Sequence, residues 1–356
     1  METKETTNLT TSRKLASVQI VQDVKPHLNS DNLALATILG WQVITKKNEM
    51  AIGEKIVYFE IDSLLPEKEW SDFMRIRNYR VKTISLRKEI SQGLILPLSI
   101  IGEGLKPDDY EVGYDLTEIL GVQKYEIDAD LPCHNDSNKP QKECTFPVDL
   151  IEKTDEPRIQ SSPQILQNFL GQPYWASLKY DGTSVTYALD SNNLENFYIC
   201  SRNFRREFNL VDDVYSMIAQ KYQIKEKLAK EGRYVLQGEI YGPKIQKNPL
   251  KEKDLKFVVF NAKDLIEGKY LDLQELESLC KQLELPMVDV IEKGDNFNYT
   301  VGELKNISKG YYPNTKNVRE GLVFRLQKNW HCGGKRYSFK IINDDFLLKK
   351  EGKEND

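Results

Sequence analysis

The chain has 356 residues, 40% of them hydrophobic, which is enough for two domains of ordinary size. A net charge of −4 and a pI near 5.7 exclude a globally basic nucleic-acid coat, so any contact with nucleic acid has to come from local basic stretches. A mean hydropathy of −0.55, without an apolar run near the roughly 18 residues that cross a bilayer, argues against a membrane-spanning helix.

Residues 1–12 are polar and include two glutamates. They lack the apolar core of a secretion signal and are too poor in arginine for a transit peptide. We therefore expect a disordered leader here. We also expect a cytoplasmic, monomeric protein that does not bind membranes.

Residues 13–121 form the first predicted domain. Its strand-like segments are rich in Val, Ile and aromatic residues, and turn residues separate them. They are LASVQIVQDV, WQVITKK, KIVYFEI, YRVKTISL and GLILPL. About five such strands in roughly 100 residues predict a small closed β-barrel such as an OB-fold. An SH3-like barrel or a sandwich would give much the same pattern.

A basic stretch interleaved with Tyr79 lies in this first domain. Its members are Arg75, Arg77, Arg80, Lys82, Arg87 and Lys88. Such a stripe can neutralise backbone phosphates without reading sequence, so it is our candidate nucleic-acid surface. The alternative is an ordinary solvated strand face.

Residues 122–155 form a predicted surface linker, because the segment is charged, carries prolines and shows little periodicity. The chain has five cysteines and no CxxC pair, so we do not expect a disulfide framework. Part of a zinc site is one interpretation of the linker, and unrelated thiols in a loop are the other. The candidate zinc ligands are Cys133, His134, Cys144, His331 and Cys332.

Residues 156–348 form the second predicted domain, which mixes strands with helices. The helical segments VDDVYSMIAQKYQIKEKLAKE and LDLQELESLCKQLE carry apolar residues at a spacing of three and four. Strands and helices in mixed order predict an α+β domain instead of a doubly wound parallel sheet. The charged residues 349–356 are predicted to be a disordered tail.

The main chemical signal in the second domain is Lys179-Tyr180-Asp181-Gly182. Alone it is weak, because average residue usage gives Lys-x-Asp-Gly by chance in about one of ten chains of this length. An exposed lysine before an Asp-Gly turn is the plain alternative. Further segments follow it in order: Ser201-Arg202-Asn203, Glu239 in LQGEIYG, Phe260 in FVVFNAKD, Glu320 in EGLVFR and Lys340 in SFKII.

This ordered set resembles the covalent nucleotidyltransferases: ATP-dependent ligases, NAD-dependent DNA ligases and mRNA capping enzymes. The front module, with LGWQV, YFEIDSLLP and ISQGLILPL, and Arg158 in TDEPRIQ are similar to the RNA ligases first defined in Naegleria and Deinococcus. DNA ligases and capping enzymes carry their OB module after the lysine. The resemblance implies an N-terminal OB-fold β-barrel followed by a mixed antiparallel-sheet, ATP-grasp-like nucleotidyltransferase domain.

The resemblance also implies a nucleotide site around Lys179, the covalent nucleophile. Its implied cofactor-binding residues are Arg158, Gly182, Arg202, Phe260, Val323 and Lys340. Phe260 would stack on adenine, Arg202 would contact the ribose or the end phosphate, and Arg158 would contact the ATP phosphates. The plainer alternatives are a core aromatic for Phe260 and a surface charge for Arg202.

Residue chemistry supports these implied roles. A lysine amine is nucleophilic only when deprotonated, and a nearby cation lowers its usual pKa of about 10.4. Asp181, Glu239 and Glu320 would together form an oxygen-rich site suited to Mg²⁺ or Mn²⁺, although Glu239 could be a satisfied strand carboxylate. Arg205 and Arg206 are expected to extend the nucleic-acid surface beside the site.

We therefore predict an ATP-dependent RNA ligase. Lys179 would form lysyl-AMP, AMP would pass to a 5′-phosphate, and a 3′-hydroxyl would close the strand. The resemblance implies that this takes place at a nick in a duplex. The residues alone do not distinguish RNA from DNA. The alternatives are a GTP-dependent mRNA capping guanylyltransferase, which the position of the OB module argues against, and a non-catalytic RNA-end-binding protein, although no matched catalytic position is substituted.

Overall fold

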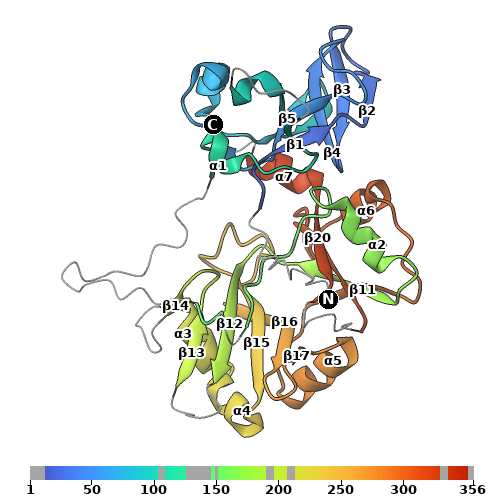
Figure 1. Cartoon of the computed structure of the whole chain (residues 1–356). Helices are drawn as coiled ribbons and strands as arrows, with labels where there is room; N and C mark the ends of the chain where they lie inside the picture. The colour runs from blue at the N-terminus through green and yellow to red at the C-terminus, as the bar shows by residue number, and fades with distance from the viewer. Residues whose placement is uncertain are drawn as a thin grey trace, which may run out of the picture. The chain divides into compact units, whose positions relative to one another are not determined.

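The computed structural model describes residues 13–102, 109–125, 146–148, 151–189, 196–206, 213–328 and 336–351. Contacts divide the chain into two compact units, Met1–Ile127 with Leu348–Asp356, and Asp128–Leu347 (Figure 1). The predicted leader and the candidate zinc ligands in the linker and near residue 331 lie outside the described residues. In the described part of the chain, no helix is long and apolar enough to cross a membrane.

The first unit consists of short antiparallel strands around a small core. Its sheets are β1 (Ala16–Ile20), β5 (Lys55–Phe59) and β9 (Leu94–Pro97); β2 (Asp23–Pro26), β3 (Leu33–Ile38) and β4 (Trp41–Lys46); β7 (Thr83–Leu86) and β8 (Glu89–Gln92); and β6 (Ser63–Leu64) and β10 (Gln123–Lys124). Its helical segments are η1 (Glu69–Arg77), η2 (Leu98–Ile101) and α1 (Thr117–Leu120). Burial alternates along β3 and β4, as expected where one face of a sheet covers a core.

The segment YRVKTISL, which the sequence assigns to one strand, is a strand only over β7. Residues 79–82 of this segment are not in a strand, and η1 ends just before them at Arg77, with its C-cap Asn78 in the left-handed conformation. Asn78 and Tyr79 both have positive φ, 49° and 57°, so the chain turns there. The basic stretch therefore spans a helix, a turn and a hairpin, and the prediction of one continuous strand was wrong.

The second unit contains two antiparallel sheets. In order across the sheet, the four-stranded one is β18 (Val290–Gly294), β11 (Tyr174–Lys179), β19 (Gly321–Leu326) and β20 (Ser338–Ile342). The six-stranded one is β14 (Arg205–Arg206), β13 (Phe197–Cys200), β12 (Thr183–Leu189), β15 (Tyr234–Tyr241), β16 (Lys256–Asp264) and β17 (Lys269–Tyr270). The helical elements are η4 (Pro163–Ile165), α2 (Leu166–Phe169), α3 (Val214–Lys221), α4 (Ile224–Glu231), α5 (Leu273–Gln282) and α6 (Val301–Ser308). A last helix, α7 (Asp344–Glu351), begins in this unit, and its residues from Leu348 onward are grouped with the first unit.

The two sheets of the second unit share a hydrophobic core. Trp175 and Leu178 of β11 belong to the same buried cluster as Tyr187 of β12 and Phe257 of β16, and α3, α4 and α5 contribute to it. The opposite face of the four-stranded sheet packs an aromatic cluster that includes Phe324. Consequently β11 lies between two cores, because Trp175 and Leu178 face one of them and Tyr174 and Ala176 face the other.

The last described helix, α7, extends to Glu351 and so includes Lys349 and Lys350, which the sequence assigned to a disordered tail. Asp344 and Asp345 lie in its first turn, and the two lysines lie in its last. Acidic residues near the N-terminus of a helix and basic residues near its C-terminus interact favourably with the helix dipole and stabilise the helix. The charges that argued for a tail therefore stabilise a helix.

Candidate active site

The centre of the site is the amine of Lys179, the last residue of β11. Its Nζ donates a hydrogen bond to Oε2 of Glu320 at 3.0 Å, with the two side chains 24% and 14% exposed. Burial lowers the pKa of Lys179, but the carboxylates of Glu320, Glu239 and Asp181 outweigh burial and raise it above its usual value. The resting amine is therefore a protonated ammonium inside a ring of acidic groups.

Glu239 of β15 is the second group of this site whose pKa is shifted. Burial raises its pKa to about 8, with a further increase from Glu320 and Asp181 and an opposing effect from Lys179. Among the described residues, no group of three or more His, Cys, Asp or Glu side chains forms a ready-made metal centre. However, three carboxyl groups share a single ammonium, and these hard oxygen ligands suit a divalent cation, which would favour their charged forms.

Gly182 allows the end of β11 to lie against β15. A Cβ at this position would lie 2.3 Å from the carbonyl oxygen of Ile240 and 2.8 Å from Cγ of Glu239. Only glycine can make such a close backbone approach without displacing a neighbour. The Asp-Gly step therefore brings Asp181 and Lys179 next to Glu239.

Two basic residues converge on the carboxylate of Asp155. Lys340 of β20 donates to Oδ1 at 2.9 Å, and Arg202 donates to Oδ2 at 2.7 Å. Arg158 lies opposite Lys340 in a parallel bridge, so all three basic residues predicted to bind the nucleotide lie near one another. Burial, Arg158 and Lys179 lower the pKa of Lys340 to about 8, whereas Asp155 opposes this decrease.

Two apolar residues predicted to bind the nucleotide, Val323 and Phe260, lie between the two sheets. Val323 of β19 pairs with Ser177 of β11 on one side and with Lys340 on the other, so it shares their face of the sheet. Phe260 is partly buried against the shared core. The guanidinium of Arg325, two residues beyond Val323, lies 5.9 Å from the Phe260 ring centroid, so this face of β19 approaches Phe260.

Comparisons with known proteins match both units. A family model described as an OB-fold domain matches residues 15–98, and one described as RNA ligase matches residues 172–342. A structure of a Naegleria gruberi RNA ligase mutant with AMP and Mn is 30% identical, covers 95% of this chain and 99% of its own, and superposes with a TM-score of 0.81. The chain belongs to the RNA ligase family. No curated protein sequence matches it.

Other solved structures of the same Naegleria gruberi RNA ligase agree with this assignment. One with PPi is 31% identical over 96% of this chain and all of its own (100%), with a TM-score of 0.80. A mutant with ATP and Mn is 30% identical over 94% of this chain, covers 99% of its own chain and has a TM-score of 0.80. The predicted fold class, an OB-fold module followed by an α+β RNA ligase domain, is confirmed.

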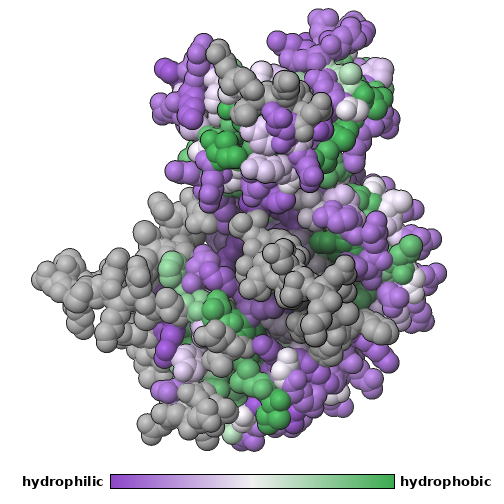
Figure 2. All heavy atoms as spheres, in the orientation of Figure 1, coloured by the Kyte–Doolittle hydropathy of each residue, from purple (hydrophilic) through white to green (hydrophobic). Residues whose placement is uncertain are grey.

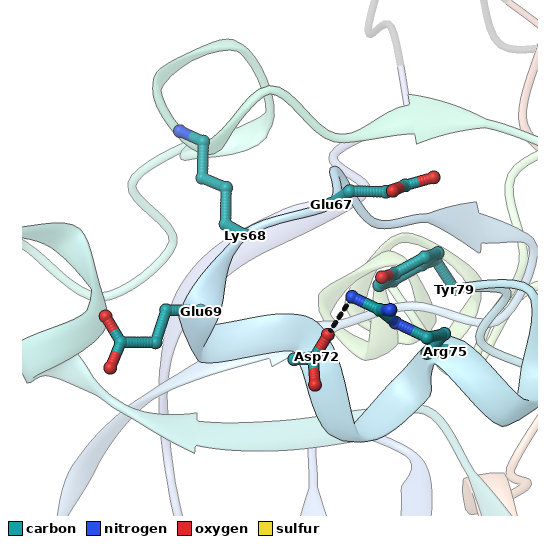
Figure 3. Close-up of a pocket in the computed structure, with 6 residues that line it drawn as sticks. All are labelled: Glu67, Lys68, Glu69, Asp72, Arg75 and Tyr79. Carbon is teal, nitrogen blue, oxygen red and sulfur yellow. Dashed lines mark hydrogen bonds and ion pairs between the residues drawn. The ribbon is translucent and has the colours of Figure 1, made fainter.

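The basic stretch of this RNA ligase does not form one surface. Arg80 is buried, pairs with Asp62 at 3.5 Å and stacks over the ring of Tyr125. Arg75 pairs with Asp72 at 2.6 Å, on the rim of an open depression of about 450 Å³ (Figure 3). The lining consists of Glu67, Lys68, Glu69, Asp72, Arg75 and Tyr79. Its carboxylates disfavour a phosphate at Arg75.

The remaining predicted nucleic-acid residues differ in exposure. Arg77, Arg87 and Lys88 are exposed, and Lys82 is partly buried. Arg205 of β14 is exposed and lies over the Tyr198 ring, whereas Arg206 forms an inward ion pair with Asp213 at 2.9 Å. On the face shown in Figure 2, hydrophilic residues cover most of the described surface. The better candidates for phosphate contacts are therefore the exposed residues Arg77, Arg87, Lys88 and Arg205.

Sequence reasoning missed Asp155 and its neighbour Glu156. Asp155 binds both Lys340 and Arg202, and Glu156 is buried against Arg336 at 2.7 Å. Both acids lie in the segment TDEPRIQ, which drew attention only to Arg158. Their partners are distant in sequence, so no local pattern indicates either contact.

Proposed function

We propose that this chain seals RNA ends with ATP, joining a 3′-hydroxyl to a 5′-phosphate at nicks in duplexes through a lysyl-AMP on Lys179. The observation that carries the proposal is the Lys179 amine held 3.0 Å from Glu320 among three carboxylates, with Lys340 and Arg202 held together by Asp155. The similar Naegleria gruberi structures hold ATP and Mn, AMP and Mn, or PPi. These are the substrate, a product fragment and the leaving group of such a first step.

In the first step, the Lys179 amine loses a proton and attacks the α-phosphorus of ATP. A P–N bond forms, the bond to the bridging oxygen breaks, and pyrophosphate leaves with the electron pair. Lys340, Arg202 and Arg158 would hold the phosphates, because cations beside a transferring phosphoryl group stabilise its charge. A divalent cation on Asp181, Glu239 and Glu320, when bound, would neutralise these carboxylates and the developing phosphate charge.

The second and third steps transfer and then release AMP. An oxygen of the RNA 5′-phosphate attacks the phosphorus of lysyl-AMP, the P–N bond breaks, and the Lys179 amine is regenerated with a proton. The 3′-hydroxyl then loses its proton to solvent and attacks the activated 5′-phosphate. A phosphodiester bond forms, the bond to the AMP phosphate breaks, and AMP leaves. Phe260 and Val323 would hold the adenine through both steps.

Labelling with nucleotide tests the reaction class. We expect the wild-type chain with magnesium to gain a covalent label from α-labelled ATP and not from GTP, with added pyrophosphate removing it. Labelling by GTP alone would favour the capping alternative. Nicked duplexes with either RNA or DNA at the 3′-hydroxyl side then test the substrate, and equal sealing of both would contradict a preference for RNA.

The pH dependence of ATP binding tests Lys340. Because the pKa of Lys340 is lowered to about 8, the free protein loses this positive charge as pH rises through 8. ATP favours the charged form, so affinity should be full below this pKa and fall above it, by at most about tenfold per pH unit. Calorimetry with a non-cleavable ATP analogue between about pH 7 and pH 9 measures this change.

Lys340→Arg is the control for this experiment, because arginine stays charged over the whole range. Its affinity for the analogue should vary less with pH than that of the wild type. A wild-type affinity that does not change through pH 8 would contradict a phosphate contact by Lys340.

The hairpin turn between β7 and β8 is our first candidate for RNA binding. Arg87 and Lys88 occupy it with φ of 49° and 72°, a conformation that asparagine also tolerates. We expect the double variant Arg87→Asn, Lys88→Asn to weaken binding of a nicked RNA duplex about tenfold and to reduce its salt dependence. Fluorescence anisotropy at two salt concentrations measures both effects.

Arg75→Ala provides the matched control in the same unit. Because Arg75 pairs with Asp72 beside two further acidic residues, its loss should change RNA affinity by less than about twofold. A larger effect of Arg75→Ala than of the double variant would place the nucleic acid near η1 instead.

A further inference from the structure

Tyr312 lies in the segment between α6 and β19 and is 1% exposed. Its backbone is fixed from both sides, because its N–H donates to the carbonyl of Asn317 at 2.9 Å and its own carbonyl accepts from Thr315 N–H at 3.2 Å. The next-door Tyr311 is 64% exposed. The loop therefore holds the Tyr312 side chain inward while its neighbour faces solvent.

The hydroxyl of Tyr312 joins the backbones of the residues at the centre of the site. It donates to the carbonyl oxygen of Lys179 at 3.3 Å and accepts from the N–H of Glu320 at 3.1 Å. The backbone of Asp181 also forms a hydrogen bond with it. A phenol has one proton to donate and lone pairs to accept with, so these contacts use its bonding capacity.

This position explains how the two strand ends stay together. Lys179 and Gly321 are the last pair of the β11–β19 ladder. Beyond this pair, the hydroxyl of Tyr312 bridges Lys179 to Glu320, whose side chains meet at 3.0 Å. If these backbone groups moved away, the buried hydroxyl would be left without hydrogen-bond partners, and this would destabilise the fold.

We infer that Tyr312 is a positioning residue for adenylylation: its hydroxyl holds the backbones of Lys179, Asp181 and Glu320 in one arrangement, so that amine and carboxylates meet the triphosphate together. The inference rests on the proposed function of Lys179. Tyr312 touches backbone atoms, so it acts on the reaction through these residues and not on ATP directly.

Tyr312→Phe is the main test, because it keeps the buried ring and removes only the hydroxyl. We expect the single-turnover rate constant for lysyl-AMP formation to fall about 10- to 100-fold, since small misplacements of a nucleophile are costly. The dissociation constant for the ATP analogue should stay within about twofold, because Tyr312 does not contact the nucleotide. Tyr311→Phe is the matched control and should keep the wild-type rate.

Hydrogen exchange gives a readout that does not depend on activity. In Tyr312→Phe, the amide of Glu320 loses its acceptor and should exchange faster, while amides in the middle of β19 keep their protection. Thermal denaturation of both tyrosine variants shows whether each is folded at the assay temperature. Should Tyr312→Phe be unfolded there, rates, analogue binding and exchange are compared at a lower temperature at which all variants are folded.

The outcomes separate the inference from the proposed function. A wild-type chain that never gains label contradicts adenylylation by Lys179, whatever Tyr312 does. A labelled wild type with an equally fast Tyr312→Phe, or with a loss confined to analogue affinity, overturns the positioning role alone. Unchanged exchange at Glu320 would overturn the bridge itself.

Discussion

Lys179→Ala and Lys179→Arg are both expected to lose lysyl-AMP formation by more than about 10⁴-fold, because no other amine can replace the attacking nucleophile. The arginine variant separates chemistry from charge. It can still pair with Glu320, which now binds Lys179 at 3.0 Å, so it should fold with near wild-type stability. The measurement is covalent transfer of labelled AMP, resolved by peptide mass spectrometry.

A substrate that already carries AMP on its 5′-phosphate makes this test sharper. Sealing this RNA requires only attack by the 3′-hydroxyl, so both variants should retain part of this activity while losing ATP-dependent ligation. Labelling of Lys179→Arg at another lysine would contradict our assignment of the nucleophile. If both variants lost the label because they were unfolded, the result would indicate a structural role for Lys179.

Glu156→Ala is expected to destabilise the second unit by about 3–5 kcal/mol, the cost of removing one partner from a buried ion pair. Glu156 is 9% exposed, accepts from Arg336 at 2.7 Å and lies 3.6 Å from Arg325. Ser338 also donates to its carboxylate. Arg325 is buried and the Arg336 side chain is 8% exposed, and burial lowers the pKa of Arg325 to about 10. Without Glu156, Arg325 would lose the carboxylate that offsets its burial, and Arg336 would keep the weaker attraction of Glu152.

Thermal denaturation measures this effect, and a decrease in Tm of about 10 °C is expected for a unit of this size. Glu226→Ala is the control, because Glu226 is exposed on α4 and its loss should change stability by less than about 0.5 kcal/mol. Equal Tm values for the two variants would show that the Glu156 cluster contributes no net stability.

The residues of the central site were predictable from sequence because their motifs keep a fixed order. Lys179, Asp181 and Gly182 lie in one motif, and the structure places Glu239 and Glu320 close enough to raise the pKa of Lys179. Their roles in binding nucleotide and metal stay predictions that the proposed experiments test. Asp155 and Tyr312 were not predictable, because their contacts form only when distant segments pack together.

The basic stretch shows a different limit of sequence reasoning. Charge alone indicates a stripe, but the direction of each side chain depends on the backbone between them. The positive φ at Asn78 and Tyr79 turns Arg80 inward, where it pairs with Asp62 and stacks on Tyr125. Neither asparagine nor tyrosine requires this conformation, so the turn could not be predicted from these residue types.

Two distant segments of the second unit are joined at residues that we propose bind the nucleotide. The N–H of Lys340 donates to the carbonyl of Pro157 at 2.8 Å, and the N–H of Ile159 donates to the carbonyl of Lys340 at 3.0 Å. Closing so long a loop is entropically costly, and this junction should be among the last to form during folding. A partly unfolded chain would then separate Arg158 from Lys340 before its central strands open. Heat or denaturant should therefore abolish ATP binding at a milder condition than the one that removes the sheet structure.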